Sequence, residues 1–164
     1  MTRPAFVAAW AASQRIYNSV NSGERVAEVV GGDVAAHIRD KKNPWRNTCA
    51  VRMSYILSQS GLSIPATVGK TKKGGDDRNY FFRVKDVITF LTHRWGTPEV
   101  VAYPPSGGGV LVGKKGVVLF DVQGWGDASG HATLFDGTGC YDHCYFNEPG
   151  ATYQTSRANF WGLS

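Results

Sequence analysis

Cys49 is the first residue whose type and placement could do chemistry. Asn47 and Thr48 offer a cap for a helix, so Cys49 is expected in the opening turn of that helix. Unpaired N–H groups and the helix dipole lower the pKa of a thiol there and favour the thiolate. A thiolate can attack an acyl carbon while the Cys49 N–H helps to hold the oxyanion. The competing interpretation is an inert buried cysteine.

His131 would supply the base that such a nucleophile needs. It opens a β-prone run after a glycine-rich approach that includes Gly124, Trp125 and Gly130, where a cleft wall or close packing is expected. A cysteine at a helix start, followed by a histidine on a later strand, is the papain-like chain order. The alternative for His131 is a hydrogen-bonded strand histidine. Trp125 is expected to line the cleft or to pack behind His131.

Asp142 is the candidate for orienting the imidazole ring. Asp136-Gly137 is typical of a two-residue type I′ hairpin, and in that register His131 faces Asp142. Directly opposed side chains lie about 4.5–5.5 Å apart at Cβ, close enough for a carboxylate to hold the ring. The spacing therefore predicts a triad of Cys49, His131 and Asp142.

Cys140 and Cys144 flank Asp142, and their role has several interpretations. Three cysteines in an exported protein suggest one disulfide and one free thiol, whereas a cytosolic protein would keep all three reduced. The pair would also suit zinc, with His143 or His131 as further ligands. In an extended strand the two cysteines would be about 13 Å apart, too far for a disulfide. We favour a curled loop with Asp142 at its apex and strand pairing that stops before residue 140.

The elements that must position these residues are helices in the first part of the chain and strands in the second. Helical patterns cover roughly residues 4–19, the segment between Thr48 and Gly61, and 87–95. The β-rich runs are 99–103, 116–122, 131–135 and 159–163. Gly31-Gly32 and residues 39–47 and 70–77 are expected to be loops. This order predicts an α+β domain, with N-terminal helices packed on a mostly antiparallel sheet.

Length and composition exclude several functions. The 164 residues carry a net charge of +5, and 42% of them are hydrophobic, which fits one folded domain over residues 1–164. No apolar run approaches the roughly 20 residues of a membrane helix. The short lysine clusters lack the interleaved aromatic residues of a nucleic-acid platform. The apolar run from Ala5 to Ala12 predicts an amphipathic helix rather than a Sec signal, so neither a membrane nor a nucleic acid is an expected partner.

Motifs along almost the whole chain resemble those of one family, the fourth class of type VI secretion amidase effectors, which are papain-like (NlpC-type) cysteine peptidases. Each motif is weak alone, but their number and order are specific. They are Arg3-Pro4 with Phe6 and Trp10, Gly31-Gly32, Asn47-x-Cys49 leading into Arg52-Met53-Ser54-Tyr55, Arg83-Val84-x-Asp86, Gly113-Lys114-Lys115-Gly116, Gly124-Trp125, Gly130-His131-x-Thr133-Leu134 and Cys140-x-Asp142-x-Cys144.

The resemblance implies roles for the residues already singled out. Cys49 would be the nucleophile, His131 the base and then the acid, and Asp142 the group that orients His131. It also implies a Cys140–Cys144 disulfide formed outside the cytosol. Asn47 is a candidate oxyanion donor that would serve equally as a helix cap. No metal and no cofactor are expected.

The resemblance also implies a substrate and partners. The family cleaves the amide between D-glutamate and meso-diaminopimelate in peptidoglycan stem peptides, in the periplasm of a Gram-negative target cell. Type VI secretion machinery would deliver the protein without a Sec signal, and a cognate periplasmic immunity protein would inhibit it.

Three other functions remain open at this point. A thiol acyltransferase on the same scaffold would use the same triad, a basic cell-wall-binding module would need neither Cys49 nor His131, and a zinc-stabilised binding domain would hold metal.

Overall fold

Helices dominate the first part of the chain and strands the second. The computed structural model describes residues 2–125 and 130–164. The helices are α1 (Phe6–Ile16), α2 (Ser22–Val30), α3 (Gly32–Ile38), α4 (Cys49–Gln59) and α5 (Val84–Trp95), with a 3-10 segment η1 (Ser106–Leu111). The strands are β1 (Thr71–Lys73), β2 (Asn79–Phe81), β3 (Glu99–Ala102), β4 (Gly116–Gln123), β5 (Gly130–Phe135) and β6 (Gln154–Gly162).

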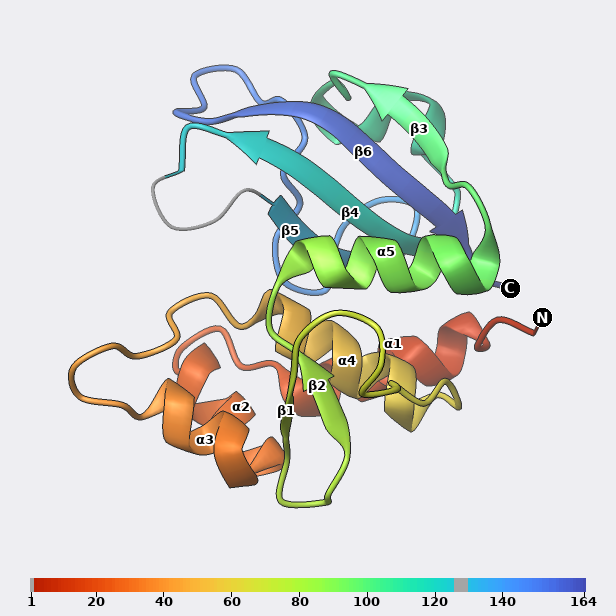
Figure 1. The fold of residues 1–164 in the computed structure, drawn as a ribbon. Helices are drawn as coiled ribbons and strands as arrows, with labels where there is room; N and C mark the ends of the chain where they lie inside the picture. Colours follow the sequence, from red (N-terminus) through yellow and green to blue (C-terminus); the bar gives the residue numbers. More distant parts are fainter. Residues whose placement is uncertain (1, 126–129) are drawn as a thin grey trace.

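The two parts form two layers. In Figure 1 the curved sheet lies above, α1 to α4 and the β1–β2 hairpin lie below, and α5 runs between them. The larger sheet has the strand order β3-β6-β4-β5, and all of its neighbours are antiparallel. The prediction of an α+β fold with N-terminal helices packed on an antiparallel sheet is therefore confirmed.

The central helix of the lower layer is α4. Its residues from Cys49 to Leu57 are all buried, and α1, α5, β2 and β5 pack around it. Such all-round burial is typical of a helix in the core. The helix ends as predicted at Gly61, whose φ of 109° lets the Leu62 N–H donate to the Leu57 carbonyl at 2.8 Å. Its packing against β5 places α4 beside the edge strand of the sheet.

β5 is an edge strand of the sheet and carries His131 opposite Phe120 of β4. Ala132 and Leu134 of β5 belong to the core cluster shared with the helices, whereas Phe135 belongs to a second cluster with Phe120. This alternation is the period of two expected for a strand that is buried on both faces. The free edge of β5 is where the loop that carries Asp142 folds back.

Two loop predictions are wrong. Gly31 (φ 68°) separates two helices that follow one another directly, because Gly32 already begins α3. A Cβ on Gly32 would lie 2.4 Å from the Gly74 carbonyl carbon, so this junction packs directly against the β1–β2 turn. The segment 70–77 contains β1, whose polar residues pair with the buried strand β2. Pairing with a buried partner outweighs the low strand propensity of a lysine-rich segment.

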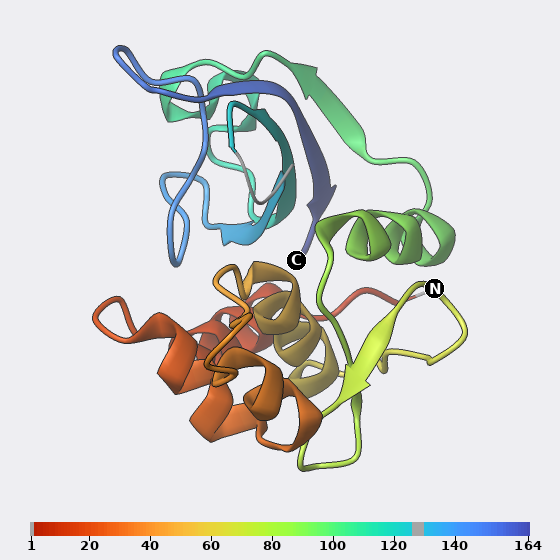
Figure 2. The same ribbon diagram turned by 60° about the vertical axis from the view of Figure 1, so that its left-hand side comes forward.

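The two ends of the described chain lie close together (Figure 1), and the C-terminal end lies between the sheet and the helical layer (Figure 2). The Phe6 N–H donates to the Ser164 carbonyl at 2.8 Å, and the Arg3 guanidinium donates to the Gly162 and Trp95 carbonyls. The apolar run Ala5–Ala12 forms much of α1, whose Phe6 and Ala12 are buried. Across residues 2–125 and 130–164, no helix is long and apolar enough to cross a membrane.

Candidate active site

Cys49, His131 and Asp142 meet where α4, β5 and the loop after β5 come together. The Nε2 atom of His131 lies 3.0 Å from Oδ2 of Asp142, an ion-pair contact in which the N–H is not aligned as in a hydrogen bond. The Cys49 thiol and the His131 side chain form a hydrogen bond. Because Nε2 faces Asp142, Nδ1 is the ring nitrogen that remains for the sulfur. The order thiol, imidazole, carboxylate is that of a nucleophile, its base and an orienting acid.

The electrostatic environment favours a charged Cys49–His131 pair. Burial raises the pKa of the Cys49 thiol, but the His131 hydrogen bond and charge, the Ala132 N–H and the Arg52 charge together bring it below its ordinary value. Burial lowers the pKa of His131, yet its contacts with Asp142 and Cys49 raise it to about 9. The two groups titrate as a coupled pair, and both shifts favour the thiolate–imidazolium form over the neutral pair.

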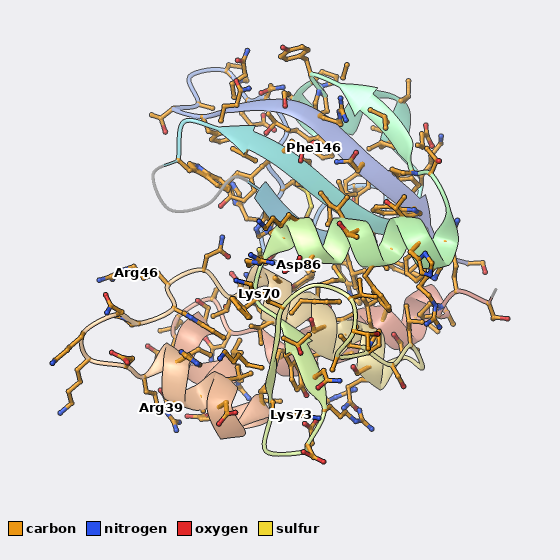
Figure 3. The ribbon with its side chains drawn as sticks, in the orientation of Figure 1. Arg39, Arg46, Lys70, Lys73, Asp86 and Phe146 are labelled. Carbon is orange, nitrogen blue, oxygen red and sulfur yellow. A yellow bond between two sulfur atoms is a disulfide. The ribbon has the colours of Figure 1, made fainter. Side chains whose placement is uncertain are left out.

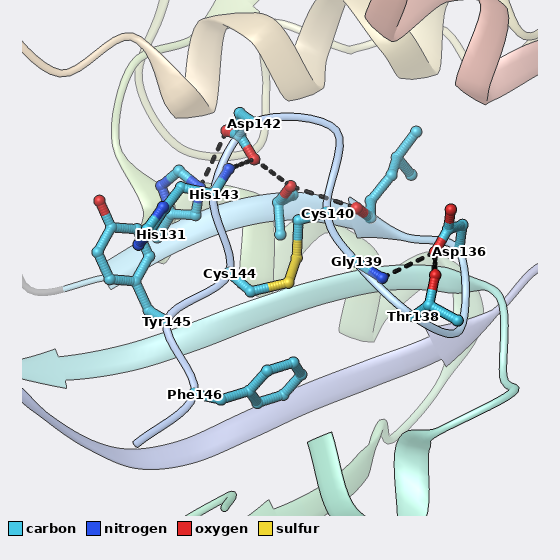
Figure 4. The surroundings of a disulfide bond; sticks show 12 residues. His131, Asp136, Thr138, Gly139, Cys140, Asp142, His143, Cys144, Tyr145 and Phe146 are labelled. Atoms are coloured by element: carbon cyan, nitrogen blue, oxygen red, sulfur yellow. Dashed lines mark hydrogen bonds and ion pairs between the residues drawn. A yellow bond between two sulfur atoms is a disulfide. The ribbon is translucent and has the colours of Figure 1, made fainter. Parts of the chain in front are cut away.

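Asp142 is held in its ionised form by donors from several parts of the chain. Arg52 Nη1 donates to its Oδ2 at 2.9 Å, while the Thr133 hydroxyl and the His143 N–H donate to Oδ1 at 2.5 and 2.6 Å. Burial alone would raise the pKa of Asp142, but His131, Arg52 and Thr133 lower it to about 2. Figure 4 shows His131 and His143 beside the Asp142 carboxylate. Asp142 thus keeps its negative charge beside the His131 ring.

A disulfide between Cys140 and Cys144 curls the loop that carries Asp142. The Cα atoms of the two cysteines are 5.3 Å apart, far closer than an extended strand would allow, and Asp142 lies midway between them. Cys49 is the free cysteine. The predicted curled loop is therefore present, and both sulfurs of the pair are occupied, so the zinc alternative is wrong for these two cysteines.

The turn before this loop differs from the prediction. Phe135 pairs with Cys140, so the turn takes four residues, 136–139, and the strand pairing reaches residue 140. A type I′ turn requires a positive φ at both central residues, and Asp136 does not have one. Its carboxylate instead accepts hydrogen bonds from the N–H groups of Thr138 and Gly139. Asp142 reaches His131 because the disulfide loop curls, not because of the predicted hairpin register.

A pocket of about 580 Å³ opens beside Cys49. Segments 44–47 and 82–85 form its walls, and Cys49, Ala50 and Gly130 complete the lining among the described residues. The Cys49 residue is only 1% exposed, so the pocket is the route by which a substrate would reach its sulfur.

Trp125 is not among the residues that line this pocket. Its ring packs edge-on against Tyr145, with ring centroids 4.6 Å apart, and also contacts Tyr153. Tyr145 in turn lies edge-on to His131 at 4.8 Å. Trp125 therefore packs behind His131, which is one of its two predicted placements. The rest of the glycine-rich approach, residues 126–129, lies outside the described residues.

Asn47 caps the start of α4. Its Oδ1 accepts a hydrogen bond from the Cys49 N–H at 3.0 Å, which is the cap that the sequence predicts. This hydrogen bond uses the Cys49 N–H, which is the group that the sequence predicts to stabilise an oxyanion. An oxyanion would therefore have to replace the Asn47 side chain at this N–H.

Two residues of the site were found in the sequence only as parts of motifs. Arg52 stands three positions after Cys49 on a helix that is otherwise buried and largely apolar, and a charge in such a place indicates a buried partner. Thr133 follows His131 at strand spacing, on the same side of β5. Neither signal identifies Asp142 as the shared partner, because that depends on how the disulfide loop folds back.

No metal site accompanies these groups in the part of the chain that the structure describes, where no set of three or more His, Cys, Asp or Glu side chains is placed to hold an ion.

A helical layer followed by an antiparallel sheet, with sulfur and imidazole meeting where the two layers touch, is the arrangement of papain-like, NlpC-type cysteine peptidases. The family model for the type VI secretion system amidase effector protein 4 (Tae4) matches residues 45–161. The chain belongs to this family, as its motifs predicted.

Solved structures agree with this assignment over the whole chain. The Tae4–Tai4 effector–immunity complex from Enterobacter cloacae has 36% sequence identity and a TM-score of 0.88, and covers 99% of this chain and 100% of its own. The corresponding complex from Salmonella Typhimurium has 32% identity and a TM-score of 0.85, with the same coverage. The effector alone from Enterobacter cloacae has 36% identity and a TM-score of 0.86, and covers 99% of this chain and 98% of its own. A comparison with curated protein sequences found no significant match.

Membership in this family establishes the activity. The chain is an antibacterial peptidoglycan amidase of the type VI secretion system, and it acts in the periplasm of the target cell, where peptidoglycan lies. The predicted enzyme class and fold are both confirmed.

Proposed function

We propose that Cys49, His131 and Asp142 are the catalytic triad of this amidase, and that the bond cleaved joins the γ-carbonyl of D-glutamate to meso-diaminopimelate. The observation that carries the proposal is the continuous contact from thiol to imidazole to carboxylate, at the floor of a pocket large enough for a peptide segment. The lowered pKa of Cys49 and the raised pKa of His131 support the assignment, because shifted pKa values of this kind mark catalytic pairs.

The reaction proceeds in two acyl-transfer steps. The Cys49 thiolate attacks the γ-carbonyl carbon, and the carbonyl electron pair moves onto oxygen. As the carbonyl re-forms, the C–N bond breaks and His131 gives its Nδ1 proton to the leaving amine of diaminopimelate. A water molecule then attacks the thioester while His131 takes a proton from it. Loss of the Cys49 thiolate releases the glutamyl carboxylic acid and restores the pair.

The oxyanion of both steps would lie at the N-terminus of α4. The Cys49 N–H points toward Asn47, and a developing negative charge would compete for it more strongly than a neutral amide oxygen. Once displaced, the exposed Asn47 side chain is free to turn its Nδ2 toward the same oxygen. Asn47 would thus act as a helix cap in the free enzyme and as the second oxyanion donor during the reaction.

We further propose that an immunity protein of the Tai4 type inhibits this chain and that the type VI secretion machinery delivers it. The support is the likeness to effectors whose structures contain Tai4, at 36% and 32% identity over 99% of the chain.

Digestion of purified muropeptides tests the assigned bond. Tetrapeptide substrates are expected to yield one fragment that ends in D-glutamate and one that begins with diaminopimelate, as measured by mass spectrometry. Incorporation of oxygen from labelled water into the glutamyl fragment distinguishes hydrolysis from acyl transfer to another amine. Intact tetrapeptides, or cleavage at another amide, would contradict the proposal.

The pH dependence of kcat/KM should follow the charged pair. Below the lowered pKa of Cys49 the thiolate gains a proton, and as the pH rises through about 9 the His131 imidazolium loses the proton that the leaving amine needs. Activity is therefore expected to fall on the acid side below the lowered pKa of Cys49 and on the alkaline side as the pH rises through about 9. Initial rates over a series of buffers of constant ionic strength measure this profile. A flat profile through both limbs would show that Cys49 and His131 do not react as an ion pair.

A further inference from the structure

Positive charge gathers at the pocket beside Cys49. Arg46 lies on one wall and Arg83 and Lys85 lie on the other, and no aspartate or glutamate is among the described residues that line it. Arg46 and Lys85 are exposed, so their charged groups lie at the rim, while Cys49 lies at the floor. The described walls of the pocket therefore carry only positive charges, whereas an ordinary protein surface mixes charges of both signs.

Arg83 is already paired. Its Nε and Nη2 atoms donate to the two carboxylate oxygens of Asp86 at 2.7 and 3.1 Å. The Lys70 N–H donates to the same carboxylate at 3.3 Å, and Figure 3 shows Lys70 and Asp86 together at the start of α5. Asp86 is 7% exposed and does not line the pocket. Asp86 therefore neutralises Arg83, whereas none of the described carboxylates pairs with Arg46 or Lys85.

Arg46 and Lys85 have no such partner among the residues that the structure describes. Within residues 2–125 and 130–164 neither forms a salt bridge or a side-chain hydrogen bond with another residue. Their long side chains are free to reach a bound anion without first breaking an internal ion pair. Arg46 and Lys85 differ in this respect from Arg83, which lines the same pocket but is paired with Asp86.

The segment that carries Arg46 is fixed beside the one that carries Lys85. The Trp45 ring stacks on the His37 ring, with centroids 4.5 Å apart, and on the Phe82 ring at 4.9 Å. The backbone N–H of Trp45 donates to the His37 carbonyl at 3.1 Å. Figure 3 shows Arg46 on the loop that this stack anchors. The ring stack thus sets the spacing of the two walls and of the charges on them.

We propose that Arg46 and Lys85 form a carboxylate-binding subsite that selects stem peptides whose free carboxylates flank the scissile amide. The inference rests on the proposed function, because it assumes that the substrate carbonyl lies at Cys49. In a γ-D-glutamyl–diaminopimelate bond, the glutamyl residue keeps a free α-carboxylate and diaminopimelate keeps one on its side chain. Amidation of either group removes its charge while preserving its size, so the subsite would discriminate between the two forms by charge.

Steady-state kinetics on matched synthetic peptides test the subsite. One substrate carries both free carboxylates, a second has the glutamyl α-carboxylate amidated, and a third has the diaminopimelate side-chain carboxylate amidated. The wild-type chain is expected to prefer the first substrate by about tenfold in kcat/KM over the substrate whose recognised carboxylate is amidated. The second and third substrates show which carboxylate is bound.

Charge-neutral variants complete the test. Arg46→Gln and Lys85→Gln are each expected to lower kcat/KM about three- to tenfold on the acidic substrate, leaving the amidated one almost unchanged. The matched controls Arg25→Gln and Lys72→Gln remove the same charges away from the pocket and should preserve the wild-type preference. A wild-type preference near one, or a preference that both pocket variants retain in full, would overturn the subsite. An active Cys49→Ala variant would instead refute the triad, so the two failures are distinguishable.

Discussion

Replacement of Cys49 with alanine is expected to lower kcat/KM for stem-peptide cleavage by at least about 10⁴-fold, since removal of a nucleophile abolishes the covalent route. Cys49 is 1% exposed, and its sulfur belongs to no disulfide. Alanine leaves the backbone N–H and its bond to Asn47 in place, so the start of α4 should be preserved. Quantified release of diaminopimelate-containing fragments measures the loss, and circular dichroism checks the fold.

The chain offers a matched pair of histidines for the same test. His131 and His143 both lie edge-on to Tyr145, with ring centroids 4.8 and 4.5 Å away. Of the two side chains, that of His131 contacts Cys49 and Asp142, whereas His143 contributes its backbone N–H to Asp142. His131→Ala should therefore be nearly as inactive as Cys49→Ala, while His143→Ala should keep most of the activity. Equal losses in the two histidine variants would show that packing on Tyr145, and not proton transfer, accounts for the effect.

The approach of Cys49 to His131 could be predicted from the sequence because each follows from a local pattern. A helix cap places Cys49 at the start of α4, and a glycine-rich approach places His131 at the start of β5. Both patterns depend on neighbours in the chain, and α4 begins at Cys49 while β5 contains His131. The order of helices and strands then restricts the ways in which these two ends can meet.

Asp142 shows where such reasoning reaches its limit. The sequence predicted its nearness to His131 through a two-residue hairpin followed by a curled loop with Asp142 at its apex. The curled loop is present, but the turn before it takes four residues, and Asp136 stabilises that turn by accepting hydrogen bonds from its backbone. The contact survives because a disulfide curls the following segment. Two constraints decide the outcome: the disulfide, which joins residues four positions apart, and the contact with the buried Arg52, which lies 90 positions away. Neither appears as a periodic pattern.

The loop predictions failed for a related reason. The segment 70–77 is polar and rich in lysine, which favours a loop when it is considered alone. Its first residues nevertheless become β1, because β2 beside them is buried and needs a partner for its backbone groups. The same segment brings the Lys70 N–H to Asp86 and so helps to shape the wall of the pocket.

Arg52 is the buried charge on which the geometry of Asp142 depends. Its side chain is 8% exposed and that of Asp142 is 3% exposed. The guanidinium lies over the ring of Tyr17 at 5.0 Å and over that of Tyr141 at 5.7 Å. It is thus fixed between two aromatic rings and the carboxylate, and it links α4 to the disulfide loop.

Arg52→Met is therefore expected to destabilise the fold by about 3–5 kcal/mol, because it removes the buried guanidinium partner of Asp142 and leaves His131 as the remaining cationic contact of that carboxylate. For a chain of this length the loss corresponds to a decrease in Tm of roughly 6–20 °C. Thermal unfolding followed by circular dichroism measures it. Arg15→Met is the matched control, because Arg15 is exposed and makes only a long contact of 3.4 Å to the Tyr55 hydroxyl. A loss no larger than that of the control would contradict the assignment of Arg52 as the counter-charge.

The pH dependence of this loss has a definite sign. The pKa of Asp142 is lowered to about 2 in the folded chain, so its ionised form contributes stability that is present above its ordinary pKa of about 3.9 and is lost as the pH falls through about 2. Without Arg52 the pKa moves back toward the ordinary value, and the stability difference between wild type and Arg52→Met should narrow over that window. Asp142→Asn breaks the same ion pair by removing its negative member. The double variant Arg52→Met, Asp142→Asn should therefore lose less stability than the sum of the two single losses. A difference that is constant with pH, together with additive losses, would mean that Arg52 stabilises α4 through its packing between Tyr17 and Tyr141 and not through the charge of Asp142.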